Sequence, residues 1–239
     1  MLSRRISVLY TISQIGLVLA SLTLIGELVY RSIAIGFPAL TGGYESLLLG
    51  IAVLSGGMPL LGRRLSGRAP ILFAAVSFVA FVALAILVSP IVSSDLQPPV
   101  PILRSAWLVL HVAFAFVGLA LFSTGGVSAI VALASRRLAE KADRVRDTAV
   151  AVGFGFYVVG GLVFGAIWAE AAWGRFWGWD PKEIWALITS VVYTVYLHLR
   201  YIGRVRASTM RLLAIVCWIL ALFTFWGVNA LFSGLHSYA

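Results

Sequence analysis

The chain has 239 residues, of which 61% are hydrophobic and only 11% are charged. A soluble domain carries about 25% charged residues, so this composition excludes an ordinary soluble protein and indicates an integral membrane protein. The formal net charge of +9 is concentrated in short segments between apolar runs. Membrane topology accounts for basic residues in such loops, so we expect no nucleic acid partner.

Seven apolar runs are each close to the length of about 20 residues that crosses a bilayer as a helix. They lie at residues 7–29, 44–61, 70–91, 106–133, 148–169, 183–202 and 210–232. We therefore predict an all-α, polytopic integral membrane protein with about seven transmembrane helices, which form a single domain over residues 1–239. The first run continues past the usual length of a signal peptide, so we expect it to remain as a helix.

Basic residues form four clusters that fall on alternate sides of successive predicted helices. The clusters are Arg4 and Arg5; Arg63, Arg64 and Arg68; Arg136, Arg137, Lys141, Arg144 and Arg146; and Arg200, Arg204, Arg206 and Arg211. The positive-inside rule predicts that all four lie on the inner face. The N-terminus is then inside, the C-terminus is outside, and residues of about 30–43, 92–105 and 170–182 form outer loops.

Polar groups near or within the apolar runs have several expected roles. The segment SRRLAEKADRVRD at 135–147 is predicted to be a solvated, charged extension of two helices joined by a tight turn. Glu27 and Arg31 are spaced for an i,i+4 pair at the outer end of the first helix. Glu45 and Glu170 either are functional or satisfy backbone groups around the outer loops. Cys217, the only cysteine, allows no disulfide within the chain.

Tryptophans concentrate in the stretch WGRFWGWDPKEIWALIT at residues 173–189. Five of the eight tryptophans of the chain lie between residues 168 and 185. An interfacial aromatic belt would explain one or two of them. Five indoles interleaved with Gly174 and Gly178 favour a platform for a large, planar, apolar ligand instead. We place Trp173, Trp177 and Trp179 at the outer surface.

A helix start follows the third of these tryptophans. Asp180 is a typical N-cap, Pro181 suits the first helical position, and Glu183 completes a capping box. The sixth predicted helix therefore begins here, and Trp185 lies one turn into it.

The three histidines are candidate donors to a metal held by such a ligand. His111 near the start of the fourth run and His236 just beyond the seventh are predicted at the outer level, as a bis-imidazole iron site requires. A lone interfacial histidine bonded to a backbone carbonyl explains each one separately, but their shared depth beside the indoles favours the pair. His198, about 27 Å along the sixth helix from its start, is either a snorkelling histidine or an inner ligand whose second donor comes from elsewhere.

The segments WAEAAWGRFWGWDPKEIWALIT, YLHLR and GVNALFSGLHSYA resemble the CcsA (ResC) family of cytochrome c biogenesis proteins. The tryptophan-rich outer segment of that family is called the WWD domain, and it corresponds here to residues of about 168–185. The resemblance extends from FPALTGGYESLLLG at residue 37 to the end of the chain. It implies a protein of the cytoplasmic or thylakoid membrane, with the WWD segment on the outer, periplasmic or lumenal side.

The resemblance also implies haem b as substrate and transported ligand. His111 and His236 would ligate the iron of an outer haem. His198 would ligate an inner haem together with a donor from the partner subunit CcsB (ResB). The residues that would hold the porphyrin are Trp173, Trp177, Trp179, Asp180 and Trp185.

The implied function is delivery of haem to the outer face of the membrane and its covalent attachment, through two thioethers, to CxxCH motifs of apocytochrome c. The chain would be the CcsA subunit of a CcsB–CcsA cytochrome c synthetase of the haem lyase type (System II). The implied partners are CcsB, apocytochrome c, haem and membrane lipid, and no catalytic residue is assigned. The alternatives are a CcmC-like relay of haem to a chaperone, a membrane cytochrome b that carries electrons, and a haem-free transporter or assembly factor in which the indoles bind only lipid or a partner.

Two features depart from the family pattern. The chain is expected to have one N-terminal helix fewer than the longer members. Ile35 or Gly36 stands where the family usually has a histidine before Phe-Pro.

Overall fold

The computed structural model describes residues 2–40, 42–64, 79, 82–83, 86 and 94–232. These residues fold almost entirely as helix, and no strand occurs among them. The predicted all-α class is therefore confirmed for the described chain.

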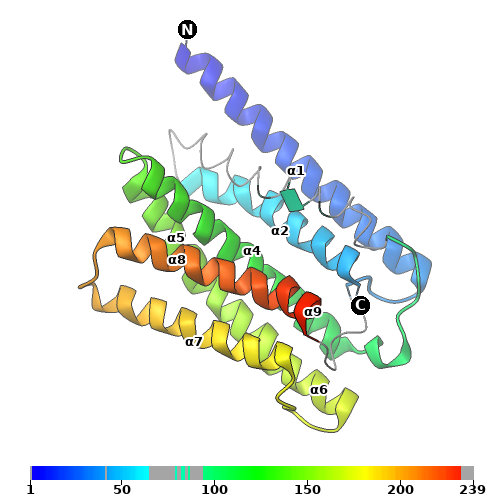
Figure 1. The fold of residues 1–239 in the computed structure, drawn as a ribbon. Helices are drawn as coiled ribbons and strands as arrows, with labels where there is room; N and C mark the ends of the chain where they lie inside the picture. The colour runs from blue at the N-terminus through cyan, green and yellow to red at the C-terminus, as the bar shows by residue number, and fades with distance from the viewer. Residues whose placement is uncertain are drawn as a thin grey trace.

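The helices lie side by side along a common direction (Figure 1). They are α1 (Leu2–Ile35), α2 (Gly43–Arg64), α4 (Ala106–Ala134), α5 (Ala139–Tyr157), α6 (Gly165–Trp173), α7 (Pro181–Ile202), α8 (Ala207–Leu222) and α9 (Val228–Leu231), with a short 3-10 turn η1 (Pro101–Leu103). Two π-helical segments join α-helices without a break: η2 (Val158–Phe164) connects α5 to α6, and η3 (Phe223–Gly227) connects α8 to α9.

Four helices in the described part of the chain are long and apolar enough to cross a membrane. They are Thr11–Ile35, Ala106–Ala134, Ala139–Trp173 and Ala207–Gly227. The predicted runs at 44–61 and 183–202 are helical as α2 and α7 but are not among the four. The run at 70–91 lies mostly outside the described residues, so the count of seven spans and the sidedness of the termini stay predictions.

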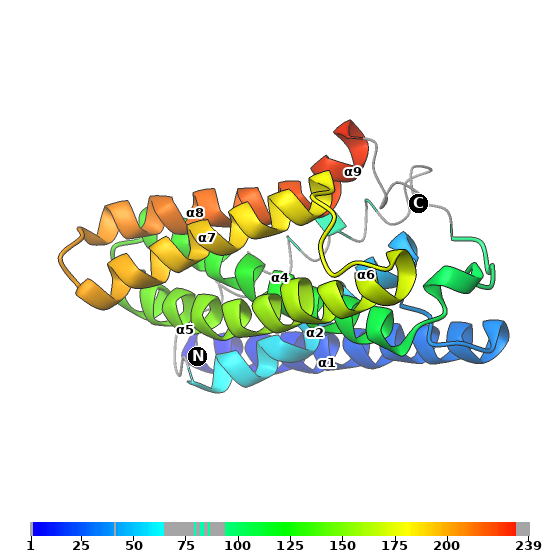
Figure 2. The same ribbon diagram turned by 90° about the horizontal axis from the view of Figure 1, so that it is seen from below.

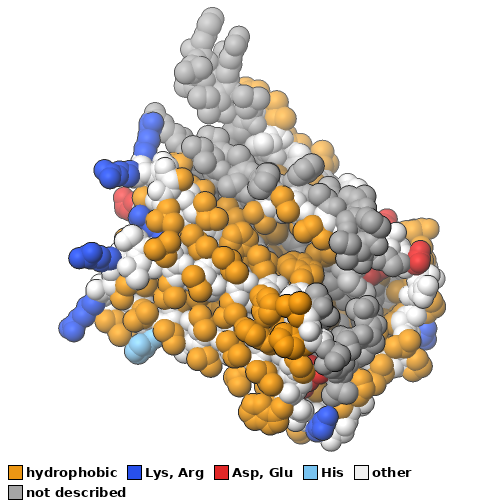
Figure 3. Space-filling view, viewed as in Figure 1, with side chains coloured by type: hydrophobic (Ala, Val, Ile, Leu, Met, Phe, Trp, Pro, Cys, Tyr) orange, Lys and Arg blue, Asp and Glu red, His pale blue; other side chains and the backbone are white. Residues whose placement is uncertain are grey.

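The two ends of the helix bundle differ in chemistry. The α4–α5 turn, the α7–α8 loop and the N-terminus of α1 lie at the same end (Figures 1 and 2), and lysine and arginine side chains gather there (Figure 3). We call this the basic end. The other end holds α6, α9 and the start of α7, and we call it the pocket end.

Charged side chains at the basic end form a buried network, so the prediction of a solvated charged face over 135–147 was wrong in part. Arg146 is only 3% exposed and pairs with Asp143 and Asp147. Arg211 of α8 binds Asp143 with an N–O distance of 2.7 Å, and Arg200 of α7 binds Asp147. The cause is tertiary, since Arg200 of α7 and Arg211 of α8 reach the carboxylates of α5. The tight turn between two helices is confirmed, since Ser135–Leu138 joins α4 to α5.

A second buried ion pair joins α1 to α2 at the pocket end. Arg31 is 4% exposed and lies 2.7 Å from a carboxylate oxygen of Glu45. The predicted pair with Glu27 is present but longer, at 3.6 Å. Arg31 also donates to the carbonyl oxygens of Ser94 and Asp95, so it fixes the segment before η1 against both helices.

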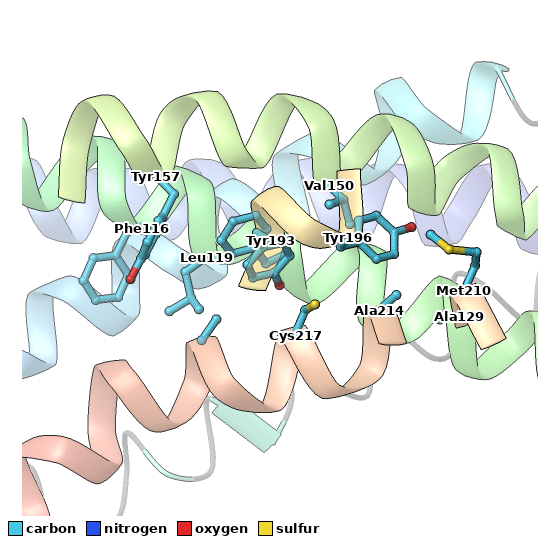
Figure 4. Packing of buried hydrophobic residues seen from close by; sticks show 12 residues of the cluster. Phe116, Leu119, Ala129, Val150, Tyr157, Tyr193, Tyr196, Met210, Ala214 and Cys217 are labelled. Atoms are coloured by element: carbon cyan, nitrogen blue, oxygen red, sulfur yellow. The ribbon is translucent and has the colours of Figure 1, made fainter. Parts of the chain in front are cut away.

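The core runs along the bundle between α4, α5, α7 and α8 (Figure 4). Phe122 and Tyr193 stack at its centre with ring centroids 3.7 Å apart. Gly118 and Gly153 bring α4 and α5 into backbone contact, because a Cβ on Gly118 would lie 3.1 Å from the carbonyl oxygen of Gly153. Close packing of small residues is a common way to associate helices in a membrane. Cys217 is fully buried in this core.

Candidate functional site

A pocket at the pocket end is lined by residues of α4, α5, η2, α6, α7 and η3 and of the loop between α6 and α7. Its empty volume is about 760 Å³, part of which is open to the surroundings. The lining residues include His111, Ala115 and Leu119 of α4, Tyr157 of α5, Gly161 of η2, Gly165, Ala166 and Trp168 of α6, Phe176 and Trp177 of the following loop, Lys182, Glu183 and Ala186 of α7, and Thr224 and Phe225 of η3. Most of this surface is apolar, so the pocket suits a largely apolar ligand with a few polar attachment points.

The imidazole of His111 is fixed on the wall of this pocket. Its Nδ1 lies 2.7 Å from the carbonyl oxygen of Gly160. Because a carbonyl oxygen only accepts hydrogen bonds, Nδ1 carries the proton and the lone pair of the neutral ring is on Nε2. A metal-ligating histidine typically uses its second nitrogen in this way. The hydrogen bond to a backbone carbonyl that would explain a lone histidine is therefore present, and the same arrangement is compatible with ligation of a metal.

The π-helical segment η2 makes this arrangement possible. The N–H of Gly165 bonds the carbonyl of Gly160, five residues earlier, and such π-bulges frequently occur at functional sites. A Cβ on Gly160 would lie 2.6 Å from the backbone nitrogen of Ala115, and one on Gly165 would lie 2.9 Å from Nδ1 of His111. Both glycines therefore allow α4 to approach η2. Neither glycine was predicted as a site residue, although the spacing of GGLVFG within an apolar run is a usable signal.

Trp168 supports the histidine from α6. It is only 2% exposed, and its ring lies nearly parallel to that of His111, with centroids 6.5 Å apart and an interplanar angle of 12°. Trp173 packs edge-on against Trp168 at 6.0 Å. Sequence reasoning counted Trp168 among the clustered tryptophans but did not identify it as a site residue, because only the fold places it beside His111.

The structure places the four tryptophans of the predicted platform in different surroundings. Trp177 lines the pocket. Trp173 packs against Trp168, and Trp185 packs edge-on against Phe223 at 4.7 Å. Trp179 makes an edge contact of 6.0 Å with Trp177 but is 68% exposed. Of the four tryptophans predicted to hold a planar ligand, one lines the pocket and three surround it.

The helix start predicted at Asp180 is confirmed. The Asp180 side chain accepts a hydrogen bond from the backbone N–H of Lys182 at 2.9 Å, and the capping box with Glu183 is complete. Glu183 also accepts from the backbone N–H of Gly178 at 2.7 Å. The two carboxylates therefore fix the loop that carries Trp177 over the pocket.

Lys182 brings a cation into the apolar pocket. Its Nζ lies 5.4 Å from the centre of the Phe225 ring, within the range of a cation–π interaction. Burial lowers the pKa of Lys182 to about 8, and the charge of Asp180 opposes this shift. Sequence reasoning did not select Lys182, because its position in the first turn of α7 is also typical of an ordinary interfacial lysine.

The other two histidines are not in the pocket. His198 lies near the far end of α7, toward the basic end, and its side chain is exposed. His236 lies outside the described residues, so the predicted outer pair of His111 and His236 stays a prediction. Glu170 is exposed at the end of α6 and does not line the pocket.

Comparison with known proteins identifies the family. Residues 42–236 match the family described as "Cytochrome C assembly protein". The cytochrome c biogenesis protein CcsA of Parasynechococcus marenigrum (strain WH8102) is 33% identical over 265 aligned positions, which cover 95% of this chain and 86% of that protein.

Two further CcsA proteins show the same relationship. The protein of Prochlorococcus marinus (strain MIT 9303) is 34% identical over 92% of this chain and 81% of its own length. The protein of Chlamydomonas reinhardtii is 33% identical over 59% of this chain and 43% of its own length. Since the family match covers most of the chain and two relatives align over nearly all of it, the chain belongs to the cytochrome c assembly protein family.

Proposed function

We propose that this protein binds haem in the pocket beside His111 and presents it for covalent attachment to apocytochrome c, as the CcsA subunit of a CcsB–CcsA synthetase. Membership of the cytochrome c assembly family supports a role in cytochrome c biogenesis and hence the handling of haem. The observation that carries the proposal for this site is the His111 imidazole, oriented by the Gly160 carbonyl inside an aromatic pocket.

The residues of the pocket fit haem as a substrate. His111 would hold the iron through Nε2, as imidazole does in many haem proteins. Trp177 and Phe176 would contact the porphyrin, since aromatic side chains bury large areas against flat apolar groups. Trp168 lies behind His111 and restricts the position of its ring. In this proposal His236 supplies the second outer ligand.

The chemistry belongs mainly to haem and to the apocytochrome. Each cysteine thiol adds across a haem vinyl group: its S–H bond and the vinyl π bond break, one S–C bond and one C–H bond form, and no net oxidation occurs. The protein's part is to bind and orient the reactive groups and to exclude water, as is general for cofactor chemistry. An apolar pocket that remains partly open at one end of the bundle suits transfer to a second protein better than permanent storage.

His198 fits a second, inner haem site shared with another chain. Its side chain is exposed on α7, and Val191 and Val195 on the same helix are also exposed apolar residues. A partner such as CcsB could contact this face and supply the second donor to iron. We propose that His198 acts only in that complex.

Blocking the pocket tests the proposed function. The Ala166→Trp variant, co-expressed with a CcsB-type partner, should lose the part of the reduced α and β bands that the haem in the pocket contributes, while a haem at His198 would keep its own bands. It should also fail to mature cytochrome c. Ala166 lines the pocket, whereas Ala171 on the same helix is exposed, so Ala171→Trp is the matched control and should retain both properties.

The outcomes separate the proposal from its rivals. Unchanged haem bands and normal maturation in Ala166→Trp would show that haem binds elsewhere. Haem bands without maturation in the wild-type complex would favour a permanent membrane cytochrome b. Haem recovered on a separate chaperone would favour a CcmC-like relay.

Replacing Trp179 should affect the stability of the protein and its affinity for haem differently. Its φ of 58° lies in the left-handed region, which costs a residue other than glycine about 1–2 kcal/mol. Because the side chain is 68% exposed, Trp179→Gly should leave the free energy of unfolding in detergent unchanged or raise it by about 1 kcal/mol. If Trp179 contacts haem, the same variant should bind haem more weakly.

The Trp179→Asn variant is the companion control, since asparagine also tolerates positive φ. Thermal unfolding and haem titration of both variants would check the prediction. A clear loss of stability in both would mean that the indole mainly packs the loop.

A further inference from the structure

Among the described residues that line the pocket, Lys182 is the one cation. Its position is set by the capping box at the start of α7, because its own backbone N–H donates to Asp180. The ammonium group lies over the Phe225 ring of η3. Two different elements therefore hold this charge at the pocket wall.

The two carboxylates closest to Lys182 in sequence accept hydrogen bonds from backbone N–H groups. Asp180 accepts the backbone N–H of Lys182, and Glu183 accepts the backbone N–H groups of Gly178 and Asp180. Among the described residues, no carboxylate lies within ion-pairing distance of Nζ of Lys182. A cation held in an apolar pocket without a paired anion is costly to the free protein, and a bound carboxylate would offset that cost.

We propose that Lys182 binds a carboxylate of the ligand, and that it thereby determines which edge of the porphyrin faces the start of α7. This inference rests on the proposed function and adds a specificity-determining residue to it. Haem carries its two propionates on one edge and its two vinyl groups toward the other. A propionate at Lys182 directs the vinyl edge away from α7, so Lys182 sets the orientation in which the reacting groups are presented.

Esterification of the propionates provides a direct test. Ferric haem and ferric haem dimethyl ester, which lacks both negative charges, are titrated into the purified full-length protein in detergent and followed by the Soret band. The wild type should prefer haem over the ester by about tenfold, as expected for a hydrogen bond to a charged group. Lys182→Gln should lose this preference while its affinity for the ester stays the same.

Two control variants separate charge recognition from structure. Lys182→Arg keeps the charge and should retain most of the preference for haem. Arg175→Gln removes an exposed cation from the loop that carries Trp177 and should leave the preference intact. Loss of the preference in Arg175→Gln but not in Lys182→Gln would overturn the proposal. So would an equal loss of affinity for both ligands in Lys182→Gln, which would indicate a packing role.

The pH dependence of affinity gives an independent readout. A bound carboxylate favours the protonated lysine, so haem affinity should be constant up to a pH of about 8 and fall above it, as follows from the lowered pKa of Lys182. Affinity for the ester should not fall in this range. Other titratable groups also face this region, namely His111, Tyr157, Asp180 and Glu183. Lys182→Gln leaves them in place, so a fall in haem affinity that persists in that variant is due to their titration.

The titrations also distinguish this inference from the proposed function. If the wild type binds neither haem nor the ester, both proposals fail. If it binds both equally well, and Lys182→Gln does the same, the haem pocket stands and only the role of Lys182 is overturned.

Discussion

The His111→Ala variant should bind haem at least about 100-fold more weakly than the wild type and should not support cytochrome c maturation. Loss of a hydrogen-bond partner behind a ligating histidine typically costs 10–100-fold in affinity, and removal of the ligand itself should cost more. The structure also orients this ring at the pocket wall, through the 2.7 Å contact between Nδ1 and the Gly160 carbonyl oxygen. Soret titration of the purified protein measures the effect.

Imidazole rescue separates ligation from folding in this variant. Added imidazole should restore a large part of the haem absorbance of His111→Ala, because the cavity left by the side chain admits it. His198→Ala is the comparison, since His198 lies far along α7 and does not line the pocket; its titration in the absence of the partner should match the wild type. Wild-type affinity in His111→Ala would exclude His111 as an iron ligand.

The Gly160→Ala variant should lower the free energy of unfolding by about 3 kcal/mol, at the upper end of the range for overpacking. The added Cβ would lie 2.6 Å from the backbone nitrogen of Ala115, and a backbone atom cannot move aside as a flexible side chain can. Separation of α4 from η2 would also lengthen the bond between His111 and the Gly160 carbonyl. We therefore expect a loss of haem affinity together with the loss of stability.

Gly155→Ala is the matched control for this change. Gly155 lies one turn and a half earlier in the same continuous helix, and a Cβ there meets no atom within 4 Å. Alanine is the better helix former by up to about 1 kcal/mol, so Gly155→Ala should be as stable as the wild type or slightly more so. Thermal unfolding in detergent compares the two variants. Equal stability would show that α4 and η2 do not pack as closely as described.

The features that the sequence predicted well depend on neighbouring residues. The capping box at Asp180 and Glu183 is local, because both partners lie within one turn of backbone. The same holds for the pair of Glu27 and Arg31, which are spaced i,i+4. The apolar runs predicted the helices because a run is also a property of neighbouring residues. Glu45, which is distant in sequence, is nevertheless the nearer partner of Arg31.

The features that the sequence did not predict depend on distant segments. His111 and Gly160 are 49 residues apart, and only the packing of α4 against η2 brings them together. Asp143 and Asp147 look like solvated residues in a polar segment, but Arg211 and Arg200 reach them from α8 and α7. Trp168 and Lys182 likewise matter because they face His111 and Phe225, respectively. Hydropathy and spacing do not reveal these contacts.

The π-helical segment η2 makes the pocket sensitive to the length of the chain as well as to its composition. A π-helix accommodates an additional residue relative to the α-helix that flanks it. Deleting a single residue from 158–164 would allow regular α-helical hydrogen bonds from Ala139 to Trp173, and the helix itself would remain intact. Because the π segment absorbs the additional residue, the residues on either side of the deletion would keep their orientation, and the change would be confined to the wide turn whose Gly160 carbonyl contacts His111. A shortening that looks harmless for a membrane-spanning segment would therefore remove the contact that orients His111 while preserving the span.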